Sequence, residues 1–551
     1  MVVALLVKPV GAYLERVFEP RQTLFDPLLL PVERLIHRLI GIDPRCEVDW
    51  RRYSLAFATF GMINIVILYC LLRWQASFPW FFPKVMTTPM TPDLAANTAV
   101  SFATTTTWQA YAGENTMSYF SQLLLAGQNF LAGAAGLAVG IAFVRGYARE
   151  KTTGLGNFWS DLIRAVLWVL LPMSLVGSVF LVAQGVPMNF LPYTVAHTVE
   201  GGTQTIAQGP VAALEFIKNL GTNGGGFFNA NGAHPFENPT PLANFVELLA
   251  IVVIPAAFTH TFGRMVGRPR DGWVLFWTMT VLFVAGLLAC SWAESSVHPA
   301  LARQITGGNM EGKEVRFGVG GSVLTAVVTS NGAAGSYNSM HDSFQPLGVI
   351  VPLLNMLLGE IVYGGLGTGL YSMIFVALVA LFLGGLIVGR TPEHVGKQLG
   401  PPEMKIIAVY TLVGPTVVLL LTALAVVTNA GRAGLTTNAG VHGFTEILFA
   451  YASAFANNGQ NMAGLSANNI FYNMTTVIAM LMGRYALALL ALALAGRFAA
   501  VSRRPPSPGT MPSDGITFGV LLTGTALLLG ALNFFPALAM GPIVEHLSMH
   551  P

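Results

Sequence analysis

One arrangement of apolar residues occurs four times in this chain: a long run, a short segment that ends in small polar residues, and a second long run. The short segments cover residues 94–104, 211–220, 319–328 and 444–455, and their endings read TTTTWQ, GTNGGG, TSNGA and ANNGQ. Because a helix needs about 20 apolar residues to cross a bilayer, these segments are too short to span it. The sequence therefore predicts four re-entrant half-helices, and the spacing of roughly 110–125 residues between endings is typical of a duplicated membrane module.

The composition indicates a membrane protein as well. Of the 551 residues, 53% are hydrophobic and only 10% are charged, whereas soluble proteins carry about 25% charged residues. We predict an all-α polytopic integral membrane protein. Its predicted spanning runs cover residues 53–72, 117–144, 162–182, 241–262, 273–292, 347–388, 406–427, 471–499 and 517–538, of which 347–388 reads as one interrupted helix. Cys46, Cys70 and Cys290 lie far apart, so neither a disulfide framework nor a thiolate metal site is indicated.

Basic residues gather after each repeat of the arrangement, and fewer occur in the connections that hold the short segments. They are Arg145, Arg149 and Lys151, then Arg264, Arg268 and Arg270, then Arg390, Lys397 and Lys405, and finally Arg497, Arg503 and Arg504. Cytoplasmic loops of membrane proteins carry an excess of Lys and Arg. We therefore expect the loops between repeats to face the cytoplasm and the four endings to face outward.

The four endings suit an ion filter. Non-helical backbone at membrane depth is tolerated only inside protein or against a water-filled cavity. Glycine permits positive φ, so successive carbonyls can turn to one side, and rings of carbonyl oxygens replace the hydration shell of K⁺. No Asp or Glu lies within the endings, which favours K⁺ or Rb⁺ over divalent ions and leaves Na⁺ open. The alternative is that the small residues only allow close helix packing, but four equivalent placements favour the filter.

The chain divides into six predicted segments. Residues 1–7 are apolar but too short to span, so the first helix is expected to be a stub, and no cleavable signal peptide is visible. The segments are 1–52, the helix stub with a basic connection; 53–150, pore repeat 1; 151–266, pore repeat 2; 267–402, pore repeat 3 with its interrupted second helix; 403–504, pore repeat 4; and 505–551, a C-terminal transmembrane helix.

Several stretches together resemble one known family over nearly the whole chain. They are GTNGGGFFNANGAHPFENPT at 221–240, NMEGKEVRFG at 309–318, NSMHDSF at 338–344, GRTPE at 389–393 and AGLSANN at 463–469. The chain resembles the potassium-binding A subunits (KdpA) of bacterial Kdp potassium-transporting ATPases, in the superfamily of K⁺ transporters. The resemblance implies four helix–pore-helix–helix repeats in a pseudo-fourfold pore, with an extra helix at each end.

The resemblance also implies a function. Such a subunit selects K⁺ from outside and passes it to a P-type ATPase subunit, with small accessory membrane subunits and lipid as further partners in the bacterial inner membrane. K⁺ is then the transported ion, and no nucleotide, nucleic acid, other metal or catalytic site is expected for this chain. Carried over by residue, the filter strands are Thr105, Thr106, Thr107 and Gln109; Thr222, Asn223 and Gly224; Ser330, Asn331 and Gly332; and Asn457, Asn458 and Gly459.

This chain departs from the family pattern at several positions. The family's first ending usually reads TNTNWQ, and Thr105 and Thr107 stand here in place of Asn. A hydroxyl keeps an acceptor but shortens it, so affinity or K⁺/Rb⁺ discrimination is expected to differ. Asn331 and Gln460 stand where Thr or Cys and Ser are common. The family's N-terminal helix also looks largely absent, from either a mis-assigned start or a truncation.

Charges inside the third and fourth repeats suggest a gate. Arg484 lies near the middle of the run 471–499, and an intramembrane charge is usually paired and functional. Glu360 is the expected partner, and it flanks the interrupted run together with Arg390. The glycines of GGLGTGLY are expected to unwind the helix below the filter; they are Gly364, Gly365, Gly367 and Gly369. By analogy with related transporters, this loop and Arg484 would stop ions leaking through and divert K⁺ sideways. The other reading of Arg484 is a purely structural ion pair.

Two further interpretations remain open at this stage. The chain has no GxxxxGK[ST] loop, no DKTG sequence and no large soluble domain, so ATP coupling would need another polypeptide. The alternative function is therefore an autonomous K⁺ channel or an ion-coupled K⁺ symporter of the same pore superfamily. The outward-loop histidines show no metal-ligand spacing, and no metal site is expected at them; they are His234, His341 and His442.

Overall fold

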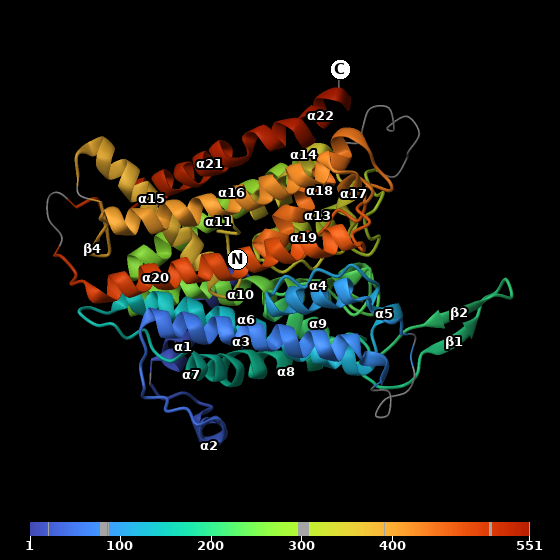
Figure 1. Cartoon of the computed structure of the whole chain (residues 1–551), viewed down its shortest axis with the longest axis horizontal. Coiled ribbons are helices and arrows are strands. Elements are labelled where there is room, and N and C mark those ends of the chain that lie inside the picture. The colour runs from blue at the N-terminus through green and yellow to red at the C-terminus, as the bar shows by residue number, and fades with distance from the viewer. Residues whose placement is uncertain are drawn as a thin grey trace.

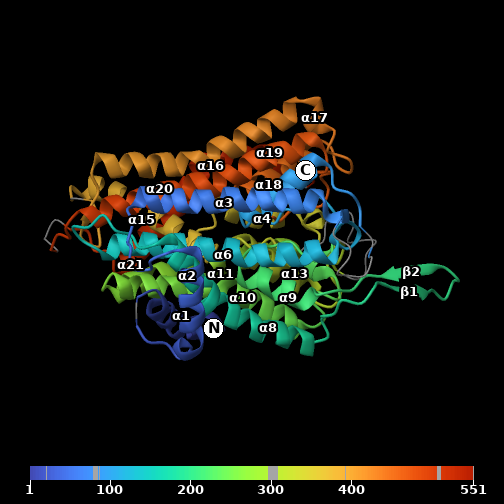
Figure 2. The same ribbon diagram turned by 60° about the horizontal axis from the view of Figure 1, so that its bottom comes forward.

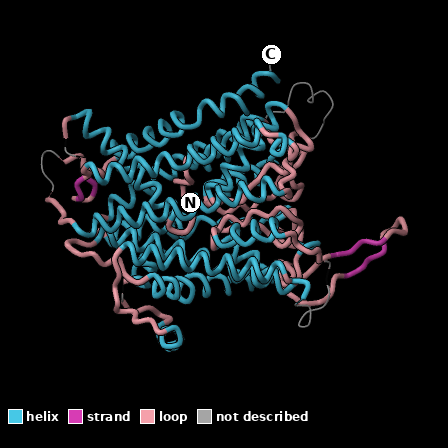
Figure 3. The backbone as a smooth tube through the Cα atoms, viewed as in Figure 1, coloured by secondary structure: helices cyan, strands magenta, loops and turns pink. Residues whose placement is uncertain are grey.

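The computed structural model describes residues 1–19, 21–77, 85, 87–295, 308–390, 392–505 and 510–549. In this part of the chain, nine helices are long and apolar enough to cross a membrane. They run side by side along the horizontal direction of Figure 1, and most of the connections lie at the two ends of the bundle, as the tube in Figure 3 makes plain. Each predicted run contributes one of these helices, so the multi-pass prediction is confirmed.

The four repeats share one order of elements, in which a spanning helix, a short helix and a second spanning helix follow one another. Repeat 1 contains α3 (Trp50–Arg73), α4 (Pro92–Ala103), α5 (Gly113–Thr116) and α6 (Tyr119–Ala148). Repeat 2 contains α7 (Phe158–Arg164), which continues through η3 (Ala165–Leu170) into α8 (Leu171–Ala183), then α9 (Val211–Leu220) and α10 (Pro241–Met265). Repeat 3 contains α11 (Pro269–Ser295), α13 (Gly318–Asn331), α14 (Pro346–Leu357) and α15 (Thr368–Val388). Repeat 4 contains α16 (Pro401–Val427), α17 (Asn429–Arg432), α18 (Gly440–Ala456), α19 (Ile470–Leu481), η6 (Met482–Ala486) and α20 (Leu487–Ala500).

The short helices α4, α9, α13 and α18 are the predicted re-entrant half-helices. All four lie in the right half of Figure 1, at the same end of the bundle. They have 10 to 17 residues, and most of their side chains are buried, because each is surrounded by the longer helices of its own and neighbouring repeats. Some spanning helices are far less buried, since only 22% of the apolar window of α3 and 17% of that of α16 are buried, as expected for helices that face lipid. The central helices α6 and α10 are mostly buried.

The interrupted run of repeat 3 is confirmed. Residues 347–388 form α14 and α15, and a non-helical link, 358–367, joins them. The link contains positive φ angles at Gly359, Glu360, Tyr363, Gly365 and Gly367, which no helix can accommodate.

The prediction of a seven-residue stub at the N-terminus is wrong. The helix α1 (Val2–Phe18) has 17 residues and continues through Pro9, and it lies along α10. The hydroxyl of Thr261 donates to the Gly11 carbonyl at 3.0 Å, and the side chains of Arg264 and Glu15 form an ion pair. Proline and charged residues suggested an end to the helix, but packing against a neighbour stabilises a proline-containing membrane helix.

The remaining elements lie outside the repeats or in their connections. The helix α2 (Asp26–Ile40) lies at the edge of the bundle below α7 in Figure 1, and its Glu33 pairs with Arg164 of α7 at 2.9 Å. The hairpin of β1 (Thr194–His197) and β2 (Thr203–Ile206) projects away from the helices, and Figure 2 shows the same projection after rotation. The chain also forms η1 (Gln75–Ser77), η4 (Asn231–Ala233), η5 (His341–Ser343), β3 (Glu393–His394), β4 (Lys397–Gln398), α21 (Ile516–Leu538), η7 (Ala539–Ile543) and α22 (Val544–Met549).

Candidate ion filter and the cavity beneath it

The backbone takes the same unusual course after each of the four short helices. Three residues follow in the order positive φ, ordinary φ, positive φ. The first and third φ angles are 66° and 50° at Thr105 and Thr107, 51° and 82° at Thr222 and Gly224, 52° and 59° at Ala333 and Gly335, and 58° and 86° at Asn457 and Gly459. Such angles favour glycine and strain other residues, so four identical courses show a shared backbone design.

Hydrogen bonds confirm that these positions are equivalent. In each repeat, the N–H of the middle residue donates to the carbonyl five residues earlier in the short helix. The four bonds are Thr106 to Ser101 at 3.0 Å, Asn223 to Lys218 at 2.9 Å, Ala334 to Thr329 at 3.2 Å and Asn458 to Ser453 at 3.0 Å. We call these four three-residue stretches the filter strands.

Three of the four filter strands have a glycine at the third position, and the strands converge so closely that these glycines leave no room for a side chain. A Cβ added at Gly224 would overlap the carbonyl oxygen of Ala334 and lie 3.0 Å from that of Asn458. A Cβ at Gly335 would overlap the same Asn458 oxygen, and a Cβ at Gly459 would overlap the Thr106 oxygen. The carbonyl oxygens of Ala334 and Asn458 therefore share the space beside Gly224, and that of Thr106 lies beside Gly459 of the neighbouring strand.

This space has the properties of a cation site. Carbonyl oxygens carry partial negative charge, and each short helix ends at its filter strand, so four helix C-termini contribute their negative dipole ends. The filter strands contain no Asp or Glu residue. Neutral carbonyl dipoles suit a weakly hydrated monovalent cation.

The predicted third strand is displaced by three residues. Ser330 and Asn331 belong to the last turn of α13, and Gly332 is its C-cap with an ordinary φ of −79°. The equivalent residues are Ala333, Ala334 and Gly335. The letters SNG match TNG and NNG of the second and fourth strands, yet α13 continues through Asn331. Within this last turn, the side chains of Ser330 and Asn331 both donate to the Val327 carbonyl, at 3.2 and 2.9 Å.

The other predicted filter residues are brought together, and several brace the strands through their side chains. The amide of Gln109 pairs with the backbone of Gly226, donating at 3.0 Å and accepting at 2.9 Å. Asn457 donates to the Thr106 hydroxyl at 2.9 Å, which ties the fourth strand to the first. Asn223 donates to the Asn129 carbonyl of α6 at 2.9 Å.

A buried ion cluster behind the second strand escaped the sequence analysis. The Lys218 ammonium donates to the Gly225 carbonyl at 2.6 Å and pairs with Glu215 at 2.7 Å and Glu237 at 2.9 Å. All three side chains are fully buried. Glu237 also accepts from the Phe228 N–H at 2.7 Å. The signal was the pair of opposite charges three residues apart inside an apolar segment, since intramembrane charges are rarely without a role.

A neutral histidine supports the outer side of the fourth strand. Burial lowers the pKa of His341 to about 4. Its Nδ1 lies 3.3 Å from the Asn461 carbonyl, and its Nε2 lies 3.3 Å from the amide nitrogen of Gln460. The neutral ring can donate to the first and accept from the second, while Gln460 also donates to the Thr329 hydroxyl at 3.2 Å.

A small cavity lies directly beneath the filter strands. Its volume is about 20 Å³, enough for about one water molecule or ion. The first residue of every strand lines it, namely Thr105, Thr222, Ala333 and Asn457, and its remaining walls include Glu360, Gly365 and Arg484.

The predicted pairing of Glu360 with Arg484 is wrong. Both residues line the cavity, and both are described, but no ion pair joins them. Glu360 accepts from the Asn458 amide at 2.8 Å. Arg484 donates to the Thr105 hydroxyl at 3.2 Å and the Ala132 carbonyl at 2.8 Å. Dipoles of the filter therefore replace the expected counter-ion of each charge.

Arg484 reaches the cavity from a local π-helical turn, η6. Such one-turn bulges within α-helices are frequent at functional sites. The guanidinium also lies over the ring of Phe57, 5.7 Å from its centre, so cation–π attraction adds to its hydrogen bonds.

The glycine-rich link 358–367 closes the cavity from below. The Leu366 N–H donates to the Thr222 hydroxyl at 3.2 Å, and the Gly365 N–H to the Gly332 carbonyl at 3.3 Å. The link passes so close to α6 that a Cβ at Gly367 would lie 2.6 Å from the Gly136 carbonyl oxygen.

Other predicted gate residues take different places. Gly369 closes the link, since its N–H donates to the Gly364 carbonyl at 2.8 Å. Arg390 is not part of the cluster. It follows the far end of α15 and donates to the Thr510 carbonyl at 3.3 Å.

Comparison with known proteins gives the context of this geometry. The family model described as potassium-transporting ATPase A subunit matches residues 1–547. A protein of Methylorubrum extorquens named potassium-transporting ATPase potassium-binding subunit is 52% identical over 547 residues, covering 99% of this chain and 95% of that protein. A protein of the same name from Rhodopseudomonas palustris is 50% identical over 550 residues, covering 100% and 96%.

The fold has a solved counterpart. The crystal structure of the potassium transporter TrkH from Vibrio parahaemolyticus superposes with a TM-score of 0.55, at 14% identity, over 90% of this chain and 98% of that one. At that identity the likeness concerns the fold alone. The chain is a multi-pass membrane protein and belongs to the family of potassium-transporting ATPase A subunits.

Proposed function

We propose that this chain is the K⁺-binding and K⁺-translocating subunit of an ATP-driven K⁺ uptake complex in the bacterial cytoplasmic (inner) membrane. The observation that carries this proposal is the fourfold repetition of the filter backbone, in which the carbonyl oxygens of Ala334 and Asn458 share the space beside Gly224 and that of Thr106 lies beside Gly459. Membership in the A-subunit family and the names of its relatives support the same conclusion.

The chemistry of the site explains selection of K⁺. A dehydrated K⁺ needs a full shell of oxygen atoms, and preformed carbonyls supply them without a net negative charge that would favour divalent ions. The hydrogen bonds of Asn457, Gln109 and Asn223 hold the strands at fixed separations. Such bracing maintains the oxygen positions whether or not an ion is present.

The cavity and the link beneath it support a diversion of the ion. An ion leaving the filter would enter a space closed by the link 358–367 and lined by the Arg484 guanidinium, whose positive charge opposes passage of a cation. Glu360, on the same wall, can attract the ion. We infer that K⁺ is held here and handed laterally to a P-type ATPase subunit, which hydrolyses ATP, with small accessory subunits in the same complex.

Uptake of ⁸⁶Rb⁺ into liposomes tests this function. One preparation contains this chain alone, and another contains it with the ATPase partners and ATP. Uptake that requires partners and ATP, and that disappears in Gly224→Asp, is the expected result, because an aspartate at this position would fill the shared space. Gly320→Asp is the matched control, since Gly320 is an exposed residue in the first turn of α13 with open space around it.

Two results would change the conclusion. Partner-independent Rb⁺ flux that Gly224→Asp blocks would make the chain an autonomous channel or ion-coupled symporter, and the fold shared with TrkH gives that alternative its basis. Partner-dependent uptake that survives Gly224→Asp as well as Gly320→Asp would refute the filter.

A further inference from the structure

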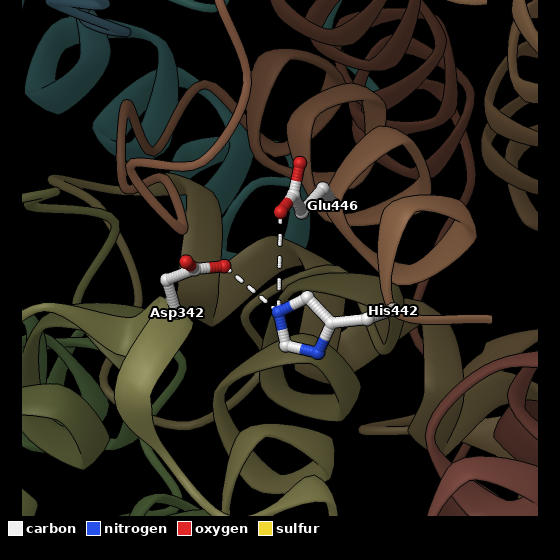
Figure 4. Close-up of side chains that lie close together, drawn as sticks. All are labelled: Asp342, His442 and Glu446. Atoms are coloured by element: carbon white, nitrogen blue, oxygen red, sulfur yellow. Dashed lines mark hydrogen bonds and ion pairs between the residues drawn. The ribbon is translucent and has the colours of Figure 1, made fainter. Parts of the chain in front are cut away.

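Three side chains with metal-binding chemistry meet at the outward end of the fourth short helix (Figure 4). Asp342 comes from η5, which follows the third filter strand. His442 and Glu446 lie one turn apart at the start of α18, so they share a face of that helix. One ligand atom from each residue lies within 4.8 Å of the other two.

We propose that Asp342, His442 and Glu446 form a binding site for a divalent transition-metal ion of the Zn²⁺ class. The Nε2 atom of His442 lies 2.8 Å from Asp342 Oδ1 and 3.9 Å from Glu446 Oε1. Ligand atoms of a tetrahedral zinc site are separated by about 3.3 Å, given Zn–N and Zn–O distances near 2.0–2.2 Å. Changes of about half an ångström in these two distances would therefore bring Nε2 to zinc-site separations from both carboxylates, with a fourth position open to water.

A second carboxylate orients the imidazole for this role. Oε1 of Glu545, on α22, lies 2.7 Å from His442 Nδ1. In metal sites the ring nitrogen that does not bind the ion typically donates to a carboxylate, which fixes the tautomer. Here that arrangement leaves Nε2 facing Asp342 and Glu446.

The buried carboxylate of Glu446 is a second observation that favours a cation here. Its side chain is fully buried, and among the described residues its Oε2 has no hydrogen-bond partner, which is costly for a charged group. Three carboxylates, from Asp342, Glu446 and Glu545, surround one imidazole. The Asn438 amide donates to both Asp342 oxygens and to Glu446 Oε1 at 2.6–3.2 Å. A divalent cation would balance this excess of negative charge.

The sequence could not reveal the site. No metal site was expected at His442 because the outward-loop histidines show no metal-ligand spacing. Asp342 lies 100 residues away in the chain. The fold brings Asp342 and His442 together, and the segments that carry them, η5 and α18, adjoin the third and fourth filter strands. Asp342 follows His341, which supports the fourth strand through Gln460, so an ion here would fasten the outer ends of strands 3 and 4 to the C-terminal helix.

Metal binding to the purified full-length chain tests the proposal. The chain is stripped with a chelator, and Zn²⁺ affinity is measured by competition with a chromophoric chelator. Co²⁺ is the spectroscopic probe, because its visible absorption reports a four-coordinate site. We expect one equivalent of Zn²⁺ per chain, and loss of that equivalent in Glu446→Gln and Asp342→Asn.

Two further variants make the result specific. Glu545→Gln should weaken affinity by about 10–100-fold, as loss of an outer partner does, while the Co²⁺ spectrum keeps its shape. His197→Gln changes an exposed histidine of β1 and should leave binding unchanged. If a ligand variant fails to fold, Asn438→Asp serves instead, and it should tighten binding by adding a carboxylate. The proposal is wrong if the unaltered chain binds no Zn²⁺, if Glu446→Gln and Asp342→Asn retain it, or if Asn438→Asp weakens it.

Discussion

Substitution of glycine by alanine at two neighbouring positions distinguishes the predicted third filter strand from the observed one. In Gly335→Ala, the new Cβ would lie 2.9 Å from the Asn458 carbonyl carbon and 3.1 Å from the Gln460 nitrogen, and would overlap the Asn458 oxygen. All these atoms are backbone atoms, so no side-chain rotation can relieve the contact. A normal contact between carbon atoms needs about 3.5 Å, which requires a displacement of about 0.6 Å or more.

The energetic effect follows from that displacement and from the backbone angle. Gly335 has a φ of 59°, a conformation that costs an alanine about 1–2 kcal/mol. If the strand moves to relieve the strain, the Asn458 carbonyl leaves its position beside the ion. We therefore expect the affinity for K⁺ to fall by about 10-fold or more, since about 1.4 kcal/mol corresponds to a factor of 10.

Gly332→Ala is the matched comparison. Gly332 has an ordinary φ, and its Cβ would meet the side chain of Ile251. Its effect should therefore be one of packing, and Ile251→Ala should relieve it in the double variant. Affinity is measured as K⁺ displacement of ⁸⁶Rb⁺ from the purified chain, and folding as thermal unfolding. The observed register would be refuted if Gly332→Ala lowered affinity more than Gly335→Ala and Ile251→Ala gave no recovery.

Three further substitutions test the supports of the filter. Lys218→Met leaves the buried Glu215 and Glu237 without a counter-ion, so it should lower stability by about 3–5 kcal/mol, measured by thermal unfolding. Arg484→Ala removes the positive charge from the cavity and should raise ATP-independent Rb⁺ leak in liposomes while lowering ATP-coupled uptake. Lys397→Met removes three hydrogen bonds, of 2.7–2.8 Å, to carbonyls at the ends of α6 and α20, and should cost about 1–3 kcal/mol without changing Rb⁺ affinity.

Each of these substitutions has a control in the same chain. Lys405→Met alters an exposed lysine of α16 and should change neither stability nor affinity. Arg390→Ala removes an arginine that does not line the cavity, so the leak should stay low. Unchanged leak and unchanged uptake in Arg484→Ala would show that the guanidinium is no barrier. A stable Lys218→Met chain would contradict the bracing of the second strand.

The sequence by itself determined the architecture. In a bilayer, the backbone groups of a run of about 20 apolar residues must hydrogen-bond within the run, so the run forms a spanning helix. Apolar segments of about half that length are too short to span the bilayer, and their fourfold repetition predicted helices that enter it without crossing it. The link between α14 and α15 was likewise predictable, because its dense glycines cannot continue a helix without cost. Family motifs and the four endings then predicted residues that lie in three of the four candidate filter strands, among them Thr222, Asn223 and Gly224.

Only the tertiary structure determined the features that depend on contacts between residues far apart in the chain. The register of the third strand depends on where α13 ends, and the letters SNG looked like an ending although the helix continues past Asn331. Glu360 bonds to the amide of Asn458, and Arg484 bonds to the hydroxyl of Thr105 and to the Ala132 carbonyl of α6, rather than to each other, because a buried charge takes the nearest well-oriented dipoles. The meeting of Asp342 with His442 has the same origin, since distances across the fold, and not along the sequence, set hydrogen bonding and metal coordination.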